Sequence, residues 1–282
     1  MRLLRVGEVG RERPLVEIGG VTYDASSVGD FDPAFWAGGG PALLAGRVAA
    51  GELAPVDAAG QRIGAPVAHP SAIICIGQNY AAHAAESGAE PPSEPIVFLK
   101  TPNTIAGPND DVVIPRGSLR SDWEVELALV IGRPAWRCAD PAEAAACIGG
   151  YLVANDLSER EWQLERSGGQ WSKGKCVPGY LPLGPYVVTA DEYDPADRRL
   201  QSWVNGDPRQ DSRTADMIFS PAELVHDLSQ YMRLEAGDII STGTPQGVAL
   251  SGRFAYLSPG DVVELAVDGL GTQRQRVVAE EV

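Results

Sequence analysis

The sequence predicts an α+β fold that is mostly β, with a small N-terminal α+β unit at residues 1–67 and a larger domain at residues 68–282. Short apolar segments of strand length, separated by Gly, Pro and Asn turns, occur along most of the chain. Only short helical segments lie between them. A doubly wound parallel sheet would need regular alternation of strands with longer helices, so the pattern argues against that class.

The N-terminal unit is expected to combine three short strands with two helices. Gly19-Gly20 marks a tight turn between two of the strands. Asp32 and Pro33 have the residue types of a helix N-cap and of the first helical position. An Ala-, Gly- and Pro-containing connection then ends near residues 65–69, where we place the domain boundary. The expected strands cover residues 3–6, 15–18 and 21–23, and the helices begin at residue 33 and at residue 42.

The larger domain is expected to insert short helices between its strands. Asn79 is expected to cap a helix at residues 80–86, and Ser158 is expected to cap a helix within residues 157–166. Asn205-Gly206 is typical of a hairpin turn. Further helices are predicted at residues 141–147 and 221–234, and strands at residues 72–76, 95–100, 112–114, 121–132, 151–154, 238–241, 262–267 and 274–278.

Composition and charge exclude several classes of partner. Lys and Arg number 23 against 38 Asp and Glu, a net charge of −15, whereas nucleic acids and anionic membranes select basic surfaces. The 4 cysteines are widely spaced and form no CxxC pair, which favours reduced thiols. The N-terminus has no signal-like apolar segment, and no apolar run is long enough to span a bilayer. We therefore expect a cytoplasmic protein that binds neither nucleic acid nor membrane.

One strand carries closely spaced carboxylates. In residues 121–132 the two-residue period of a strand places Asp122, Glu124 and Glu126 on one face. Carboxylates this close repel one another unless a cation or proton lies between them, and hard divalent cations take such oxygen ligands. Asp156, at the end of a later strand, could add a third ligand. The alternatives are a solvated strand face and a helix-capping Asp156.

Two side chains could form a catalytic pair. His83 and Glu86 are three residues apart on a predicted helix, so they share a face. Glu86 could then orient the imidazole, which would take a proton from water. For an arbitrary histidine, a structural or surface role is the more common alternative.

Two lysines and one turn could contribute further polar groups. Lys100 ends a predicted strand, and Lys175 lies in a Gly-containing loop. Either ammonium could neutralise a carboxylate or a developing enolate, although solvated lysines are the ordinary alternative. Gly243 and Thr244 could offer a backbone N–H and a hydroxyl to a ligand, although such residues also form common turns.

Taken together and in order, these motifs resemble the fumarylacetoacetate hydrolase family from about residue 71 to the C-terminus. Each motif alone is weak, but the ordered set is specific. The matching segments are Ile76-Gly77-Gln78-Asn79-Tyr80 with His83 and Glu86, Phe98-Leu99-Lys100, Asp122-Trp123-Glu124-Val125-Glu126, Asn155-Asp156-Leu157-Ser158, Gly174-Lys175, Pro182-Leu183-Gly184-Pro185, Val204-Asn205-Gly206 and Thr242-Gly243-Thr244-Pro245-Gln246-Gly247-Val248.

The resemblance implies a mixed β roll or barrel-like catalytic domain, usually dimeric. It implies a divalent cation held by Glu124, Glu126 and Asp156, with Mg²⁺ or Mn²⁺ expected and Ca²⁺ as an alternative. It also implies that His83 and Glu86 form the catalytic dyad and that Lys175 lies near the reacting oxygens. Substrate contacts are expected from Gln78, Tyr80, Lys100, Arg160, Gln163, Gly243 and Thr244.

The expected activity is metal-dependent hydrolysis of a carbon–carbon bond in an acylpyruvate-like 2,4-diketo acid, giving pyruvate and a second acid. Within the family, the segments around Arg160 and Lys175 look most like bacterial 2,4-diketo-3-deoxy-sugar-acid hydrolases and ureidoglycolate lyase-like proteins. Alternatives are a β-keto acid decarboxylase, a hydroxymuconate-type isomerase and a non-catalytic keto-acid binder. Gln78 and residues 177–180 depart from common family patterns near the expected pocket, which leaves the acyl group open.

Overall fold

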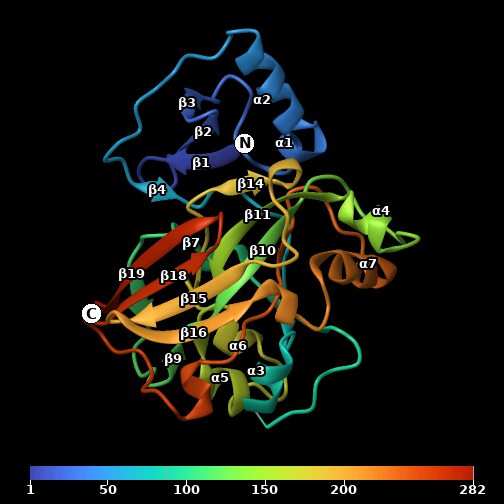
Figure 1. Ribbon diagram of the computed structural model, residues 1–282. Coiled ribbons are helices and arrows are strands. Elements are labelled where there is room, and N and C mark those ends of the chain that lie inside the picture. The colour runs from blue at the N-terminus through green and yellow to red at the C-terminus, as the bar shows by residue number, and fades with distance from the viewer. Residues whose placement is uncertain (87, 282) are drawn as a thin grey trace.

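The computed structural model describes residues 1–86 and 88–281, whose strands form two large sheets and two small pairs (Figure 1). The ten-stranded sheet has the order β3 (Val21–Asp24), β2 (Arg13–Ile18), β1 (Arg2–Val6), β14 (Val187–Thr189), β11 (Ile148–Asn155), β10 (Val125–Ile131), β17 (Ile239–Ser241), β5 (Ile73–Gly77) and β6 (Ile96–Lys100), with β4 (Ile63–Gly64) paired to β1. The five-stranded sheet has the order β16 (Asp207–Arg213), β15 (Arg199–Val204), β18 (Val262–Val267), β19 (Gly271–Ala279) and β8 (Val112–Ile114). The pairs are β12 (Ser158–Glu159) with β9 (Ser121–Asp122), and β13 (Leu181–Pro182) with β7 (Ile105–Ala106).

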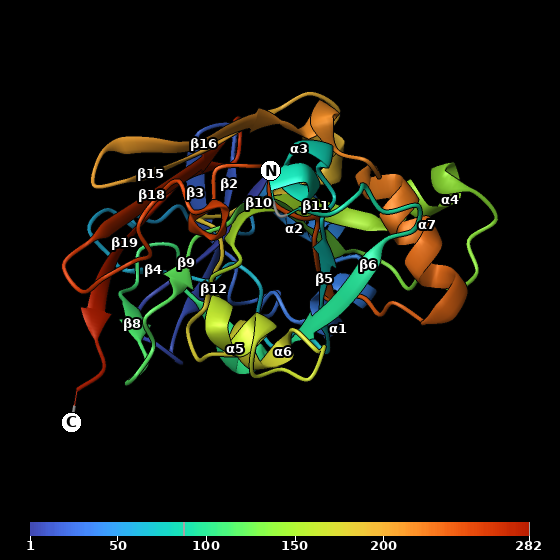
Figure 2. The ribbon, with the colours of Figure 1, turned by 90° about the horizontal axis from the view of Figure 1, so that it is seen from below.

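Short helices lie at the edges of the sheets. α3, α5 and α6 lie at the lower end of the molecule in Figure 1; seen from below, α5 and α6 lie together, across from α3, and α4 and α7 lie to one side (Figure 2). Within the described ranges, both large sheets stay open and neither closes into a barrel. The α+β, mostly β fold class is therefore confirmed as a roll of open sheets. The helices are α1 (Pro33–Ala37), α2 (Gly40–Ala49), α3 (Ala81–Glu86), α4 (Pro141–Ala145), α5 (Arg160–Leu164), α6 (Ser172–Lys175) and α7 (Pro221–Tyr231).

The N-terminal strands continue the large sheet. β1 pairs antiparallel with β14, and Leu3 lies opposite Val187. As predicted, Asp32 caps α1, since its carboxylate accepts a hydrogen bond from the Phe35 N–H at 2.9 Å. The ribbon places β1–β3, α1 and α2 at the end of the molecule opposite α3, α5 and α6 (Figure 1). The division near residue 67 remains a prediction.

Strand β10 lies at the centre of the molecule and is buried on both faces. Val125, Leu127 and Leu129 belong to one hydrophobic cluster, whereas Ala128 and Val130 belong to a second cluster on the other face. This alternation follows from the two-residue period of a strand. A solvated face for this strand is therefore excluded, and any polar side chain on it must find partners inside the protein.

Two expected helix caps are wrong. Ser158 pairs in β12, and the cap of α5 is Glu159, whose carboxylate accepts from the Trp162 N–H at 2.7 Å. Asn79 is fully buried, and its side chain bonds to the backbone of Phe219 and Thr242. The amide donates to the Phe219 and Thr242 carbonyls and accepts the Phe219 N–H, so it pairs backbone groups that are buried or partly buried with it.

None of the helices within residues 1–86 and 88–281 is long and apolar enough to cross a membrane.

Candidate active site

Three buried carboxylates converge at the end of the β10–β11 ladder. Val125 lies opposite Asn155 in this antiparallel pair, so Glu124 and Asp156 occupy adjacent positions just beyond it. The Asp156 N–H donates to the Glu124 carbonyl at 3.0 Å. Oxygens of Glu124, Glu126 and Asp156 lie within 4.8 Å of one another, and all three side chains are buried. The structure thus brings together the three residues expected to hold a cation.

Three cationic side chains contact this carboxylate cluster. Lys175 Nζ lies 2.6 Å from a Glu124 oxygen and 2.9 Å from an Asp156 oxygen. Lys100 Nζ lies 2.6 Å from the other Asp156 oxygen, and Arg160 Nη2 lies 2.7 Å from Glu124. Because all of these groups are buried, their attraction is little screened by water.

The two glutamates have opposite pKa shifts. Burial acts to raise the pKa of Glu124, but Lys175, Arg160 and His83 outweigh burial and lower it to about 2. Burial raises the pKa of Glu126 well above its ordinary value, and the charges of Asp156 and Glu124 raise it further. The difference follows from their contacts, since Glu124 has two cationic partners. Glu126 is instead held by hydrogen bonds from the Ser241 hydroxyl and the Gly243 N–H.

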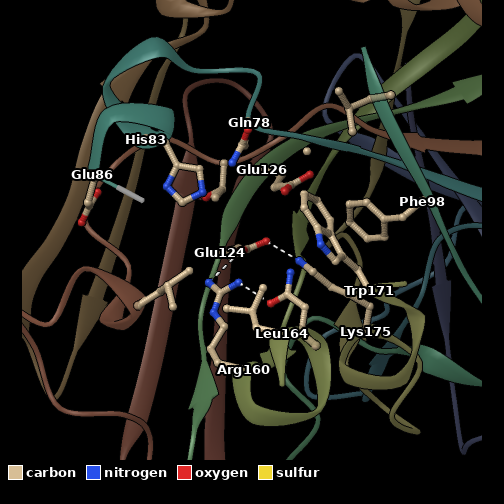
Figure 3. A pocket seen from close by; sticks show the side chains of 15 residues that line it. Gln78, His83, Glu86, Phe98, Glu124, Glu126, Arg160, Leu164, Trp171 and Lys175 are labelled. Atoms are coloured by element: carbon tan, nitrogen blue, oxygen red, sulfur yellow. Dashed lines mark hydrogen bonds and ion pairs between the residues drawn. The ribbon is translucent and has the colours of Figure 1, made fainter. Parts of the chain in front are cut away.

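His83 lies across the pocket from the carboxylates and points toward them from α3 (Figure 3). It is only 6% exposed. Burial lowers its pKa, with Arg160 and Lys175 acting in the same direction, while Glu124 and, to a smaller extent, Glu86 raise it. The net lowering keeps the imidazole neutral at pH 7, which is the form that can accept a proton.

Glu86 lies at the outer side of the same helix. Its carboxylate accepts the Gly247 N–H at 2.8 Å and forms an ion pair with Arg253 at 2.8 Å. Glu86 thus ties α3 to the loop after β17, besides adding a negative charge near His83. That His83 and Glu86 form a catalytic dyad stays a proposal. The charge of Glu86, which acts to raise the pKa of His83, is consistent with it.

A pocket of about 250 Å³ opens above the cluster. It contains four of the expected substrate contacts, namely Gln78, Arg160, Gln163 and Thr244. Arg160 is oriented through Nε to Asp122 at 2.8 Å and through Nη1 to Gln163 at 2.9 Å. The other lining residues are Ile76, Gly77, His83, Glu86, Phe98, Glu124, Glu126, Leu164, Trp171, Lys175 and Leu250.

Three expected substrate contacts do not line this pocket. Lys100 bonds to Asp156 and to the Leu157 carbonyl at 3.0 Å, so it positions a carboxylate from behind. Gly243 uses its N–H on Glu126. Tyr80 is 1% exposed within the main hydrophobic cluster because its backbone follows the buried strand β5. In this structure these three residues have structural contacts, and their expected substrate contacts stay predictions.

Buried amides near the cluster were missed by sequence reasoning. Asn155 accepts the Glu124 N–H at 3.1 Å and donates to Gln275 at 3.1 Å. Gln210, on β16 of the other sheet, accepts the Val125 N–H at 3.0 Å. Only Asn155 had a usable signal, because it adjoins Asp156. Gln210 and Gln275 come from distant strands with ordinary alternating patterns.

Gly77 leaves room for the Trp171 ring. A Cβ at residue 77 would lie 2.4 Å from the ring, so we expect Gly77→Ala to displace Trp171. Because the ring is at the pocket and partly exposed, folding should be little affected while kcat/KM falls about tenfold through misplacement. The matched control is Gly46→Ala in α2, where a Cβ meets no neighbour within 4 Å. Steady-state kinetics and thermal melting of both variants test this, and an unchanged kcat/KM in Gly77→Ala would contradict it.

Known proteins resemble the chain along its whole length. The model of the fumarylacetoacetate (FAA) hydrolase C-terminal family matches residues 72–278. A protein of Burkholderia cenocepacia strain HI2424, named only as a hydrolase, is 44% identical over 284 residues and 98% of both chains. The solved 5-carboxymethyl-2-hydroxymuconate delta-isomerase of Mycobacterium smegmatis is 34% identical, with a TM-score of 0.79 and 100% of both chains covered. The solved maleylpyruvate hydrolase of Sphingobium sp. SYK-6, in complex with manganese(II) and pyruvate, is 27% identical, with a TM-score of 0.80 and 100% coverage of both chains.

Proposed function

Because this chain belongs to the fumarylacetoacetate hydrolase family, whose members are enzymes, we propose that it is a divalent-metal-dependent hydrolase of acylpyruvate-like 2,4-diketo acids. Water would add to the distal carbonyl, the carbon–carbon bond beside it would break, and the electron pair would pass to the enolate that becomes pyruvate. The products are pyruvate and the acid derived from the acyl group. The observation that carries the proposal is the buried Glu124, Glu126 and Asp156 cluster facing His83 across one pocket.

The donor set fits a hard divalent cation. All three groups are carboxylates, which suit Mg²⁺ or Mn²⁺, and Ca²⁺ is an alternative. Burial, and after it the charges of Asp156 and Glu124, raise the pKa of Glu126, and a bound cation would stabilise its ionised form. Glu124, Glu126 and Asp156 would hold the cation. When bound, it would draw electron density from the oxygens of the keto acid.

Lys175 and Arg160 would bind and orient the anionic end of the substrate. Both line the pocket, and both are fixed by ion pairs with Glu124. Fixed positive charges in a dry site stabilise negative charge that develops during reaction, since they need no reorganisation. Lys175 would therefore offset the charge of the leaving enolate.

His83 would act as the general base. Burial holds its pKa below the ordinary value, so the ring is neutral and accepts a proton from water. The nearby Glu86 carboxylate favours the protonated ring that results. The proton can then pass to the enolate carbon, which completes the atom balance.

We expect Glu86→Ala to lower kcat by about 10- to 100-fold, since general bases contribute about 10²- to 10⁴-fold and this variant weakens the base without removing it. Divalent-cation affinity should stay within about twofold, because Glu86 is not part of the carboxylate cluster. Glu90→Ala, at an exposed position beyond α3, is the matched control. Stopped-flow kinetics and calorimetric cation titration supply the two readouts. Unchanged turnover in Glu86→Ala would reject the dyad.

A second candidate uses the same site without an attacking water. The similarity to a solved delta-isomerase favours isomerisation of a hydroxymuconate-type acid, and decarboxylation of a β-keto acid such as oxaloacetate would use the same enolate. A non-catalytic keto-acid binder is the remaining alternative. Reaction in ¹⁸O-labelled water separates them, because only hydrolysis places solvent oxygen in the released acid.

Turnover of a substrate panel with Mg²⁺, Mn²⁺ or chelator tests the proposal. The panel contains acylpyruvates, 2,4-diketo-3-deoxy sugar acids, oxaloacetate and a hydroxymuconate. Pyruvate release from a diketo acid, abolished by chelator, is the expected result. Carbon dioxide from oxaloacetate alone, or isomerisation alone, would replace it with the second candidate. We also propose a homodimer, which sedimentation analysis would check.

A further inference from the structure

The pocket has a charged floor and an apolar rim. Glu124, Arg160 and Lys175 form the floor, whereas Trp171, beside Phe98, and the half-exposed Leu164, near Arg160, form the rim (Figure 3). The rings of Phe98 and Trp171 pack edge to face with centroids 5.4 Å apart. Leu164 is 48% exposed although it borders a polar site. Exposed apolar side chains at a cavity mouth gain by covering an apolar part of a ligand.

Both strong cations of the floor already have two carboxylate partners. Arg160 contacts Asp122 at 2.8 Å and Glu124 at 2.7 Å. Lys175 contacts Glu124 and Asp156. Under the proposed function both would bind the keto-acid end of the substrate, which leaves neither for a second carboxylate at the other end.

In the part of the chain that the structure describes, the outer side of the pocket holds an ion pair and no unpaired cation that lines the pocket. Glu86 lines the pocket, and its carboxylate already pairs with the guanidinium of Arg253 at 2.8 Å. A second carboxylate on the substrate would meet Glu86 and the apolar side chains of Leu164, Leu250 and Trp171. A buried or half-buried charge without a partner is strongly disfavoured.

The net charge of the buried cluster also favours a singly charged substrate. Four carboxylates and three side-chain cations leave one negative charge, which a divalent cation would turn into one positive charge. A singly charged keto acid then neutralises the site, whereas a doubly charged one leaves it negative. The groups are Asp122, Glu124, Glu126 and Asp156 with Lys100, Arg160 and Lys175.

We infer that the site selects singly charged diketo acids whose acyl group is uncharged and apolar, over those ending in a second carboxylate or in a polyhydroxylated chain. The hydroxyl groups of a polyhydroxylated chain would lose hydrogen bonds to water where they contact Leu164, Leu250 and Trp171. Of these side chains, only the indole N–H can form a hydrogen bond in return. The inference rests on the proposed function for the bound cation and for the keto-acid end of the ligand, but its binding test does not depend on turnover.

Binding of three six-carbon 2-keto acids to the manganese-loaded protein tests the preference. The probes are 2-oxohexanoate, 2-oxoadipate and 2-keto-3-deoxygluconate, which share the keto-acid end and differ in the rest of the chain. Calorimetry should show 2-oxohexanoate binding at least tenfold more tightly than the other two. Equal affinities, or tighter binding of either other probe, would overturn the inference.

A charge placed at the rim should reverse the order. In Leu164→Arg, we expect the affinity for 2-oxoadipate relative to 2-oxohexanoate to rise about tenfold. Leu43→Arg is the matched control, because Leu43 is also a helical leucine, 47% exposed, and lies in α2 at the other end of the molecule. If both variants change the ratio equally, or neither does, the rim assignment is wrong.

The outcomes separate this inference from the proposed reaction. Tight binding of 2-oxohexanoate without pyruvate release from any diketo acid would keep the preference and reject the hydrolase. Pyruvate release with the highest kcat/KM for a substrate bearing a second carboxylate would keep the hydrolase and reject the preference. No binding of any probe would reject the preference as well.

Discussion

Lys175→Met is expected to lower turnover at least 100-fold and to destabilise the cation-free protein by about 3 to 5 kcal/mol. Removing one partner from a buried ion pair leaves the other charge uncompensated, and that cost is typically of this size. Lys175 has two such partners, Glu124 and Asp156, at 2.6 and 2.9 Å. The loss of turnover follows from the loss of a fixed charge near the enolate.

Manganese should restore most of the stability of Lys175→Met but not its turnover. A divalent cation compensates the same carboxylates, whereas it cannot replace the ammonium beside the substrate. Denaturant unfolding with chelator and with manganese measures the first effect, and pyruvate release measures the second. Lys173→Met, at an exposed position of the same helix, is the control. Turnover of Lys175→Met within threefold of wild type would contradict the assigned role.

The two glutamates are expected to change the stability of the cation-free protein in opposite directions. At pH 7, Glu126→Gln should raise the free energy of unfolding, because burial holds the pKa of Glu126 well above its usual value and its ionisation opposes folding. Glu124→Gln should lower it by a few kcal/mol, since Lys175 and Arg160 each lose a partner. Both variants should lose cation affinity and turnover by more than about 100-fold, the upper range for residues that only support a ligand.

The pH dependence gives each glutamate a distinct signature in chelator. The folded pKa of Glu126 is raised above 4.5, so its ionisation destabilises the fold, and stability falls as pH rises through that pKa. The folded pKa of Glu124 is lowered to about 2, so its contribution is full above 4.5 and is lost as pH falls toward 2. Between pH 3 and 8, the free energy of unfolding should therefore no longer fall with rising pH in Glu126→Gln. In Glu124→Gln it should fall less with decreasing pH than in the wild type. Identical pH curves for the two variants would contradict these contacts.

Local patterns predicted the elements better than their ends. The Asn205-Gly206 turn joins β15 to β16 as expected, because both residues adopt the positive φ that this turn requires. The helix ending at Tyr231 was expected to continue to residue 234. Caps failed where tertiary contacts used the capping side chain, as at Asn79, whose amide bonds to Phe219 and Thr242.

The site was predictable where its residues are close in sequence or form family motifs. Glu124 and Glu126 share a strand face by periodicity, and their convergence with Asp156 follows once β10 pairs with β11. The positions of Lys100 and Tyr80 were not predictable. The sequence pattern around a lysine at a strand end is the same whether its ammonium contacts substrate or a protein carboxylate. Only the three-dimensional packing decides which oxygen the ammonium reaches.

The sequence by itself determined the fold class, the family resemblance and the set of charged residues from which the site is built. Those properties depend on local periodicity and on ordered motifs, which a linear chain records directly. The tertiary structure decided which carboxylate is neutralised and which is not, since Lys175 and Arg160 both reach Glu124 while Glu126 receives only neutral donors. It also placed apolar side chains above a charged floor. Both outcomes arise from distances between segments far apart in the chain, and those distances set the strength of every buried electrostatic interaction.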